Sequence, residues 1–340
     1  MARRKYVSIK EVAARAGVSF QTASKVLNGG DVRVSAETAA RIVAAAEGLG
    51  YRPNTIARSL VQRSTATLGL IASDATDVAI TLASVAAEQA ARRHGHAVLV
   101  GHLAPGGGDG ASIAATLIER RVDGIIAAAP DLEEDAEVGD LLRTYGPAVS
   151  LQSIPGGGIP LVGSNHRDTG RIAAEHLIGL GHTAIGTVTG RFRRRVTRSR
   201  LHGYEDALRA AGIEPDDGLV AEADWTPAGA AAATRALLER RPQITALFVH
   251  SDMMAMGVLS ALHAAGRRVP TGVALVSCDD IPFAQFLTPP LSTVRVPLAE
   301  TGERAVELLL KAIAGDPVPE KPSLLPVELI VRESCGGNVV

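Results

Sequence analysis

Residues 18–28 have the sequence VSFQTASKVLN, and this stretch decides how the N-terminal part of the chain folds. If the stretch is helical, each residue is rotated about 100° from the one before it. Four polar or aromatic side chains then fall within roughly 140° of arc: Phe20, Gln21, Ser24 and Lys25. Ala23, Val26 and Leu27 fall on the other side. Such a helix is predicted to pack through its apolar side and to expose its polar side.

The residues before this helix predict a second helix and a tight turn. Ser8-Ile9-Lys10-Glu11 is a capping box that opens a helix, and Gly17 can end that helix in the left-handed conformation. Ser19 can then cap the next helix only two residues later. Two short helices joined in this way form a helix-turn-helix. A third helix is predicted after its cap, Ser35, with four residues facing inward: Ile42, Ala45, Ala46 and Leu49.

The charge of the chain is divided unequally along its length. Residues 1–63 hold 11 lysines and arginines against 4 acidic residues, whereas the remaining 277 residues hold 24 against 32. A basic N-terminal unit joined to an acidic body indicates contact with a polyanion through the N-terminus. Gln21 can pair with an adenine edge and Lys25 can donate to guanine. The alternative is that the polar side of this helix is simply solvated.

The body of the chain alternates strand-like and helix-like segments. Examples are TLGLIAS, ITLASVAAEQAARRHG, HAVLVGHL, TAIGTVTG, ITALFVHSD and VALVSCDD. This βαβ alternation predicts an α/β fold with parallel sheets covered by helices. The units are too many for one sheet, and IPGGGIP interrupts them near the middle. We therefore expect two lobes, with a ligand cleft at the carboxyl ends of the strands.

Other features of the sequence exclude several classes of protein. The two cysteines, Cys278 and Cys335, lie far apart, which favours a reducing cytoplasm without structural disulfides. The N-terminus has no apolar run of a signal peptide, and the long uncharged residues 146–166 contain too many glycines and prolines for a membrane helix. No catalytic motif, metal-ligand spacing or convincing cofactor motif is found, so we expect no enzyme, metal or cofactor. The six arginines of 191–200 are predicted to be mostly a solvated loop at the cleft mouth, or alternatively to bind an anionic effector.

Several segments resemble the LacI/GalR family of transcriptional regulators. They are IKEVAARAGVSFQTASKVLN, VSAETAARI and GYRPNTIARSL near the N-terminus, and RIAAEHLIGLGH, RLHGYEDALRAAG, SDMMAMGVLSALHAAGRRVP and SCDDIPFAQFLTPPLSTVR in the body. The resemblance implies a helix-turn-helix headpiece at 1–52 and a hinge helix with linker at 53–65. It implies a periplasmic-binding-protein-like effector and dimerisation domain at 66–340. Its N-lobe is expected at about 66–164 plus 296–324, and its C-lobe at about 165–295 plus 325–340.

The resemblance also implies which residues contact DNA. The base readers are Phe20, Gln21 and Lys25, and Leu60 in the hinge is the side chain that enters the minor groove. Alternatively, Leu60 packs a linker onto the body. The complete predicted DNA-binding set is Ser19, Phe20, Gln21, Thr22, Ser24, Lys25, Asn28, Tyr51, Asn54, Ala57 and Leu60. The family more often has tyrosine in place of Phe20 and arginine or histidine in place of Lys25.

The effector pocket is assigned by the same resemblance. Its predicted residues are Asp74, Arg200, Trp225, Ser251 and Asp279, with Asp74 closing the first strand and Arg200 opening a helix. Guanidinium and carboxylate groups can each bind paired hydroxyls, and Trp225 can stack on a sugar ring. The family usually has asparagine in place of Ser251, glutamine in place of Val296, and an Asn-Pro-aromatic segment in place of DATDVAI.

These observations predict a dimeric cytoplasmic repressor that binds a pseudo-palindromic double-stranded operator and no membrane. A small-molecule effector, expected to be a sugar or glycoside, releases it. Three alternatives remain open: a regulator whose ligand is a co-repressor, a phosphorylated sugar or a purine; a solute-binding protein; and an enzyme on a Rossmann-like fold. The chain ends without a heptad tail after VELIVRES, so a dimer is expected in preference to a tetramer.

Overall fold

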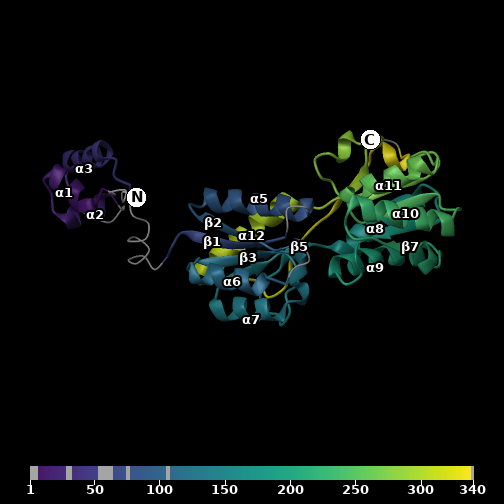
Figure 1. The fold of residues 1–340 in the computed structure, drawn as a ribbon, viewed down its shortest axis with the longest axis horizontal. Coiled ribbons are helices and arrows are strands. Elements are labelled where there is room, and N and C mark those ends of the chain that lie inside the picture. The colour runs from purple at the N-terminus through teal and green to yellow at the C-terminus, as the bar shows by residue number, and fades with distance from the viewer. Residues whose placement is uncertain (1–6, 28–32, 53–63, 74–76, 105–107, 338–340) are drawn as a thin grey trace. The chain divides into compact units, whose positions relative to one another are not determined.

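The computed structural model describes residues 7–27, 33–52, 64–73, 77–104 and 108–337. The chain separates into two compact units, residues 1–66 and 67–340 (Figure 1). Each unit has its own hydrophobic core and is described by itself below.

The first unit contains three helices: α1 (Ile9–Ala16), α2 (Phe20–Leu27) and α3 (Ala36–Leu49). The predicted caps are all present. Ser8 and Glu11 form the capping box, and Gly17 ends α1 with a φ of 65°. The Ser35 hydroxyl accepts a hydrogen bond from the Thr38 amide at the start of α3. These local signals account for the position of each helix end.

The core of the first unit consists of small side chains around Ile42. Ala13, Ala16 and Ala23 pack with it, and the partly buried Val26 and Leu27 extend the cluster. Because the contacting residues of α1 and α2 are alanines, the two helices approach closely. The Arg41 side chain of α3 donates a 2.9 Å hydrogen bond to the carbonyl of Ala16, which satisfies an acceptor at the end of α1.

The second unit begins with a lobe built on a four-stranded sheet, called the N-lobe here. Its strand order is β2 (Ala97–His102), β1 (Thr67–Ala72), β3 (Gly124–Ala128) and β4 (Ala148–Ser150), all parallel. Helices α5 (Val78–Arg93) and α12 (Leu298–Ala314) cover one face, and α6 (Gly110–Glu119) and α7 (Ala136–Tyr145) cover the other. The short helix η1 (Pro130–Glu134) follows β3 at its carboxyl end.

The other lobe, called the C-lobe, has a six-stranded sheet. Its order is β12 (Glu328–Ile330), β10 (Ser292–Arg295), β9 (Ala274–Asp279), β8 (Ala246–Val249), β6 (Ile185–Thr189) and β7 (Val220–Glu222). Within the described part of the chain, β12 runs antiparallel to β10, and the other neighbouring strands of this sheet are parallel. Helices α8 (His166–Gly179) and α9 (Arg195–Ala210) pack on one face, and α10 (Pro227–Arg240) and α11 (Asp252–Ala264) on the other.

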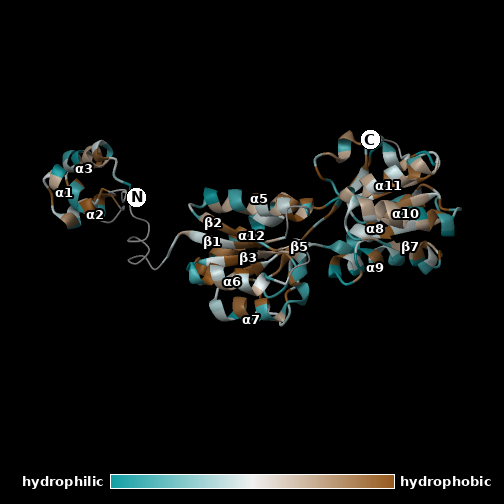
Figure 2. Cartoon of the chain, viewed as in Figure 1, coloured by the Kyte–Doolittle hydropathy of each residue, from teal (hydrophilic) through white to brown (hydrophobic). Residues whose placement is uncertain are grey.

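The lobes are joined where the chain leaves β5 (Val162–Ser164), where β10 leads into α12, and between β11 (Ser323–Leu325) and β12. Strands β5 and β11 pair with each other in parallel. Figure 2 shows apolar residues concentrated on the central strands of both lobes, where buried strands between two helical layers are expected. The predicted fold class, an all-α headpiece followed by a two-lobed α/β body, is confirmed.

Candidate functional site

Helix α2 exposes the side that its periodicity predicts. Phe20 keeps 48% of its surface exposed, Gln21 and Lys25 are exposed, and Ser24 is half-buried. Ala23, on the opposite side, is fully buried against α1 and α3. An exposed phenylalanine beside an amide and an amine forms a surface that can contact base edges through both apolar and hydrogen-bonding groups.

Ser19, Thr22 and Tyr51 also have structural roles within the first unit. The Ser19 hydroxyl accepts a 3.1 Å hydrogen bond from the Thr22 amide and lies 2.8 Å from the Thr22 hydroxyl, so it caps α2. The Tyr51 amide donates to the carbonyl of Ala46 at the end of α3. A capped helix N-terminus carries partial positive charge, which suits a phosphate group next to it.

Five of the predicted site residues lie outside the described residues. They are Asn28, Asn54, Ala57, Leu60 and Asp74. Strand β1 ends at Ala72, and the prediction that Asp74 closes this strand stays a prediction.

Arg200 lies on α9, and glycines set its position. Helix α9 begins at Arg195, so Arg200 is its sixth residue and does not open the helix as predicted. The arginines of residues 191–200 predict a solvated loop, whereas residues 195–200 form the start of α9. A Cβ on Gly170 would lie 1.8 Å from the carbonyl oxygen of Arg200, and one on Gly203 would lie 1.8 Å from that of Arg167. Only glycine at both positions lets α8 and α9 approach this closely.

The C-lobe buries an ion pair at the carboxyl end of its sheet. The Arg200 Nη2 lies 3.1 Å from the Asp279 Oδ1, and these residues are only 4% and 6% exposed. The Arg200 Nη1 also donates to the carbonyl of His250. Burial raises the pKa of Asp279 to about 6, although the Arg200 charge opposes this rise. The two predicted pocket residues are thus in direct contact.

The backbone of Asp279 and Asp280 is held in an unusual conformation. Their φ values are 113° and 55°, in a region that most side chains avoid. The Asp280 carboxylate accepts hydrogen bonds from Arg295 at 2.8 Å and from Arg332 at 2.7 Å. Because Arg295 precedes the crossing into α12, this network ties the Asp279 corner to a segment that joins the lobes.

Ser251, the fourth described pocket residue, is buried at the start of α11. Its hydroxyl accepts a 3.2 Å hydrogen bond from the Met254 amide and caps the helix. The next residue, Asp252, accepts hydrogen bonds from the Ser277 and Thr293 hydroxyls and from a backbone amide. Burial raises the pKa of Asp252 to about 7. Asp252 therefore organises the ends of β9 and β10, a role that its position on α11 alone does not reveal.

Trp225 lies in a tight corner between β7 and α10. Its φ is 72°, and its indole ring covers Gly190, where a Cβ would lie 2.0 Å from the ring atom Cε2. The guanidinium carbon of Arg194 lies 6.0 Å from the centre of the indole ring. This geometry suits a cation–π contact.

The arginine-rich segment is not a solvated loop throughout. Arg193 and Arg194 form ion pairs with Asp131 in η1, at 3.2 and 3.3 Å, and Arg194 reaches Asp77 at 3.8 Å. The Arg195 amide also donates to the Glu133 carboxylate in η1. Three consecutive arginines of the C-lobe therefore contact the N-lobe, at η1 and at the start of α5. Sequence analysis missed Asp77, Asp131 and Arg194 as pocket residues. The cluster of arginines was the available signal.

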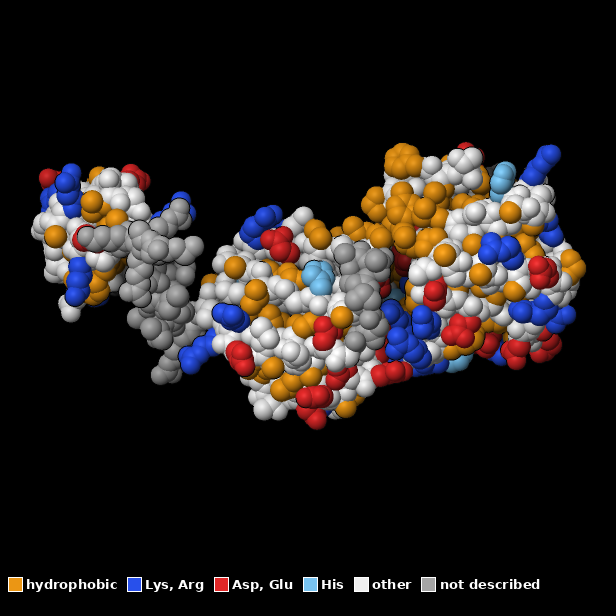
Figure 3. Space-filling view, in the orientation of Figure 1, with side chains coloured by type: hydrophobic (Ala, Val, Ile, Leu, Met, Phe, Trp, Pro, Cys, Tyr) orange, Lys and Arg blue, Asp and Glu red, His pale blue; other side chains and the backbone are white. Residues whose placement is uncertain are grey.

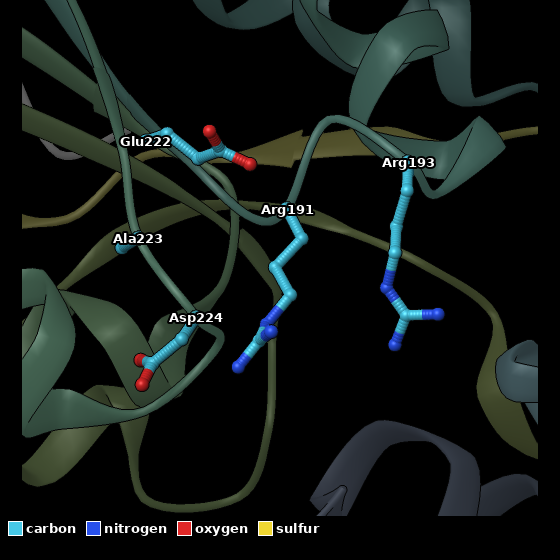
Figure 4. A pocket seen from close by; sticks show the side chains of 5 residues that line it. All are labelled: Arg191, Arg193, Glu222, Ala223 and Asp224. Carbon is cyan, nitrogen blue, oxygen red and sulfur yellow. The ribbon is translucent and has the colours of Figure 1, made fainter. Parts of the chain in front are cut away.

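A hollow of about 370 Å³ lies next to this segment. It is lined by Arg191, Arg193, Glu222, Ala223 and Asp224, and Figure 4 shows the Arg191 side chain extending toward Asp224. The Thr226 hydroxyl, helped by the charge of Arg191, holds the pKa of Asp224 below its usual value. Figure 3 shows basic and acidic side chains side by side between the lobes. The mouth of the pocket is therefore polar and contains both signs of charge.

Two other kinds of site were sought over the described ranges. Among these residues, His, Cys, Asp and Glu form no group of three or more that could hold a metal ion. The described helices include none that is long and apolar enough to cross a membrane.

Comparison with known proteins identifies the family. Residues 8–54 match the family described as bacterial regulatory proteins, lacI family, and residues 174–335 match the periplasmic binding protein-like domain. The chain is 33% identical to the HTH-type transcriptional regulator AscG of Escherichia coli K12, over 95% of this chain and 97% of that protein. It is 34% identical to the regulator CelR of Thermobifida fusca, over 98% and 100%.

Solved structures agree with these sequence matches. The chain is similar to the lac repressor dimer bound to operator and the anti-inducer ONPF, with 30% identity, a TM-score of 0.88, and coverage of 97% and 99% of the two chains. It is also similar to the CelR–cellobiose complex, with 32% identity, a TM-score of 0.72, and coverage of 96% and 99%. A headpiece with an exposed recognition face and a two-lobed body define a DNA-binding transcription regulator. The chain belongs to the LacI family of bacterial regulatory proteins.

Proposed function

We propose that this protein is a dimeric transcriptional repressor that a sugar or glycoside releases from its operator. The exposed face of α2, opposite the buried Ala23, is the observation that carries the proposal. The family and the relatives described as repressors support it. The proposal is DNA binding and not catalysis, because the similar proteins are described as a transcriptional regulator and as repressors.

The DNA interface is proposed to have two kinds of contact. Phe20, Gln21 and Lys25 read base edges in the major groove, since they are the exposed side chains of α2. Ser19, Thr22 and Ser24, on or next to α2, and Tyr51, after α3, contact the phosphate backbone. Each headpiece would contact one half-site, so two would read a pseudo-palindrome. The predicted minor-groove contact of Leu60 remains a prediction.

The effector pocket is proposed to lie at the carboxyl ends of the C-lobe strands. The Arg200–Asp279 pair offers adjacent donors and acceptors, and hydroxyl groups of a sugar can use both. Trp225, next to Gly190 and Arg194, offers a flat apolar surface. CelR was solved with cellobiose, which supports a carbohydrate ligand for a relative of this size and fold.

Dimerisation is proposed to use the apolar surfaces of the body. Val85 on α5 and Leu99 and Val100 on β2 are exposed in the N-lobe, and Met256 and Phe286 are exposed in the C-lobe. Figure 3 shows an apolar patch on the C-lobe. Exposed large apolar side chains gathered in patches mark protein interfaces. The lac repressor in the similar structure is a dimer on its operator.

Effector binding is proposed to act by shifting a population between two lobe arrangements. Two segments that join the lobes meet at Arg295, which donates to Asp280 beside Asp279 and pairs with Glu328 at the start of β12. A ligand held by Asp279 therefore favours one conformation of these segments. It can change the affinity for DNA only if it binds the two lobe arrangements with different affinities. The sign of the effect distinguishes an inducer from a co-repressor.

A gel-shift assay tests the proposal. The purified chain is expected to retain a sequence-specific DNA fragment and to release it when a sugar from a thermal-shift screen is added. Retention strengthened by the ligand would support the co-repressor alternative. No preference for any DNA sequence would contradict the proposed function and would favour a solute-binding protein.

A further inference from the structure

Arg194 bridges the two lobes across the proposed effector pocket. It belongs to the C-lobe, just before α9, and its Nη2 lies 3.3 Å from both carboxylate oxygens of Asp131. Its Nη1 lies 3.8 Å from the Asp77 Oδ2. The side chains of Arg194 and Asp131 are each only 16% exposed. Water and salt therefore screen this pair less than a surface ion pair.

The same guanidinium lies over Trp225. Its carbon is 6.0 Å from the centre of the indole ring. The Arg194 Nε and the Trp225 Nε1 are both buried, and neither has a hydrogen-bond partner among the described residues. Buried donors without partners are costly, and they are found where a ligand or water supplies the acceptor. Two such donors therefore meet beside one aromatic face.

Neighbouring residues hold this segment in place without covering the indole ring. Arg193 also pairs with Asp131, at 3.2 Å, but its side chain is 43% exposed and extends into the hollow of Figure 4. The Arg195 amide donates to the Glu133 carboxylate at 2.9 Å, and its side chain donates to the Ser153 hydroxyl at 2.9 Å. The contact with Trp225 is thus particular to Arg194.

The groups that face the guanidinium limit the ligand. A ring that stacks on Trp225 must occupy the position of the Arg194 guanidinium. Once Arg194 moves, Asp77 loses its contact with Arg194 and Asp131 keeps its ion pair with Arg193, so donors of a ligand can replace those of Arg194. Sugar hydroxyls can donate to these carboxylates and accept from the Arg194 Nε and the Trp225 Nε1. A carboxylate or a fully ionised phosphate ester cannot donate to Asp131 and Asp77 and would be repelled by them.

We propose that Arg194 is a specificity-determining residue of the effector pocket, which covers Trp225 and selects uncharged, polyhydroxylated rings over anionic ones. The inference rests on the proposed function, because it names the ligand class of the proposed pocket. Displacement of Arg194 also breaks its ion pair between the lobes, so ligand binding is coupled to one of the contacts that hold the lobes together, beside those of Arg193 and Arg195.

Trp225 provides the test, because it is the only tryptophan in the sequence. Its quenching by acrylamide reports how well the indole ring is covered. Arg194→Gln is expected to raise the Stern–Volmer constant and to shift the emission to the red, and Asp131→Asn is expected to do the same. Arg193→Gln is the matched control, since it removes an adjacent arginine that pairs with the same carboxylate. It is expected to quench like the wild type.

Salt and phosphate complete the experiment. Raising the KCl concentration is expected to increase quenching of the wild type toward that of Arg194→Gln, whose own quenching stays constant. Inorganic phosphate, added at the same ionic strength as KCl, is expected to give the same Trp225 emission as KCl gives. Equal quenching of the wild type and Arg194→Gln would overturn the inference that Arg194 covers Trp225. The same holds if Arg193→Gln is quenched as strongly as Arg194→Gln. A saturable response to phosphate would overturn the preference for uncharged ligands.

Gel shifts of the same preparations separate this inference from the proposed function. If neither the wild type nor any variant binds a DNA sequence, the proposed function fails. The quenching data still report whether Arg194 covers the Trp225 ring. If DNA is bound but Arg194→Gln does not expose Trp225, the inference about Arg194 alone fails. Circular dichroism confirms that each variant is folded.

Discussion

Replacing Asp279 by alanine tests the buried ion pair most sharply. The substitution removes the carboxylate that contacts Arg200 and leaves an arginine that is 4% exposed, whose guanidinium still donates to the His250 carbonyl. Breaking a buried pair from one side costs about 3–5 kcal/mol. For a unit of this size, each kcal/mol lowers the melting temperature by about 2–4 °C, so we expect a loss of roughly 6–20 °C.

Asp279→Asn is the matched control. Asparagine keeps an oxygen acceptor for Arg200 and tolerates a positive φ better than alanine does. As a neutral amide, it also avoids the burial cost that raises the pKa of Asp279 to about 6. We expect it to melt between the wild type and Asp279→Ala, since Arg200 keeps an oxygen acceptor but loses its counter-charge, and to lose the effector response.

The assay combines thermal unfolding with a gel shift. Both variants should bind DNA at a temperature where they are folded, because the headpiece is a separate unit. Neither should be released by the effector. An Asp279→Ala variant that melts with the wild type would refute the energetic reasoning. Normal effector release in Asp279→Asn would show that the carboxylate does not bind the ligand.

Three further changes test other parts of the account. Lys25→Ala should weaken operator binding by about 1–3 kcal/mol, or about 5- to 150-fold, and relax preference at one base pair per half-site, measured by gel shift; unchanged preference would contradict its role. Gly190→Ala places a Cβ 2.0 Å from the Trp225 ring, so it should weaken effector binding in calorimetry and leave DNA binding intact; unchanged affinity would place the ligand elsewhere. Effector affinity should rise with pH through about 6, because Asp279 has a raised pKa there and hydroxyl donors favour its ionised form; the opposite slope between acidic and neutral pH would exclude the carboxylate as acceptor.

The headpiece could be predicted from sequence because its signals are local. Capping residues fix the helix ends, and the rotation per residue fixes which side of α2 contains Ala23. The alternation of segments likewise predicts the two-lobed α/β body, whose strands and helices follow one another along the chain. In both cases, each interaction that determines the structure joins residues close in sequence or repeats with a fixed period.

The effector pocket could be predicted only in part, because its contacts depend on how the lobes meet. Arg194 and Asp131 are far apart in sequence, and nothing local to either residue indicates their pairing. Arg200 was placed at a helix start because the arginines before it read as a loop, whereas α9 begins five residues earlier. Asp252 is used by the fold itself, through hydrogen bonds to Ser277 and Thr293 that only the packed sheet brings together.

The central claim is that α2 of this chain reads a specific DNA sequence. Selection of binding sites from a pool of random duplex DNA, with the full chain at physiological salt, tests it directly. The account predicts an enriched pseudo-palindrome, and it predicts that Lys25→Ala loses preference at one position in each half-site. A pool that remains random after selection, or a motif that Lys25→Ala leaves unchanged, would contradict it.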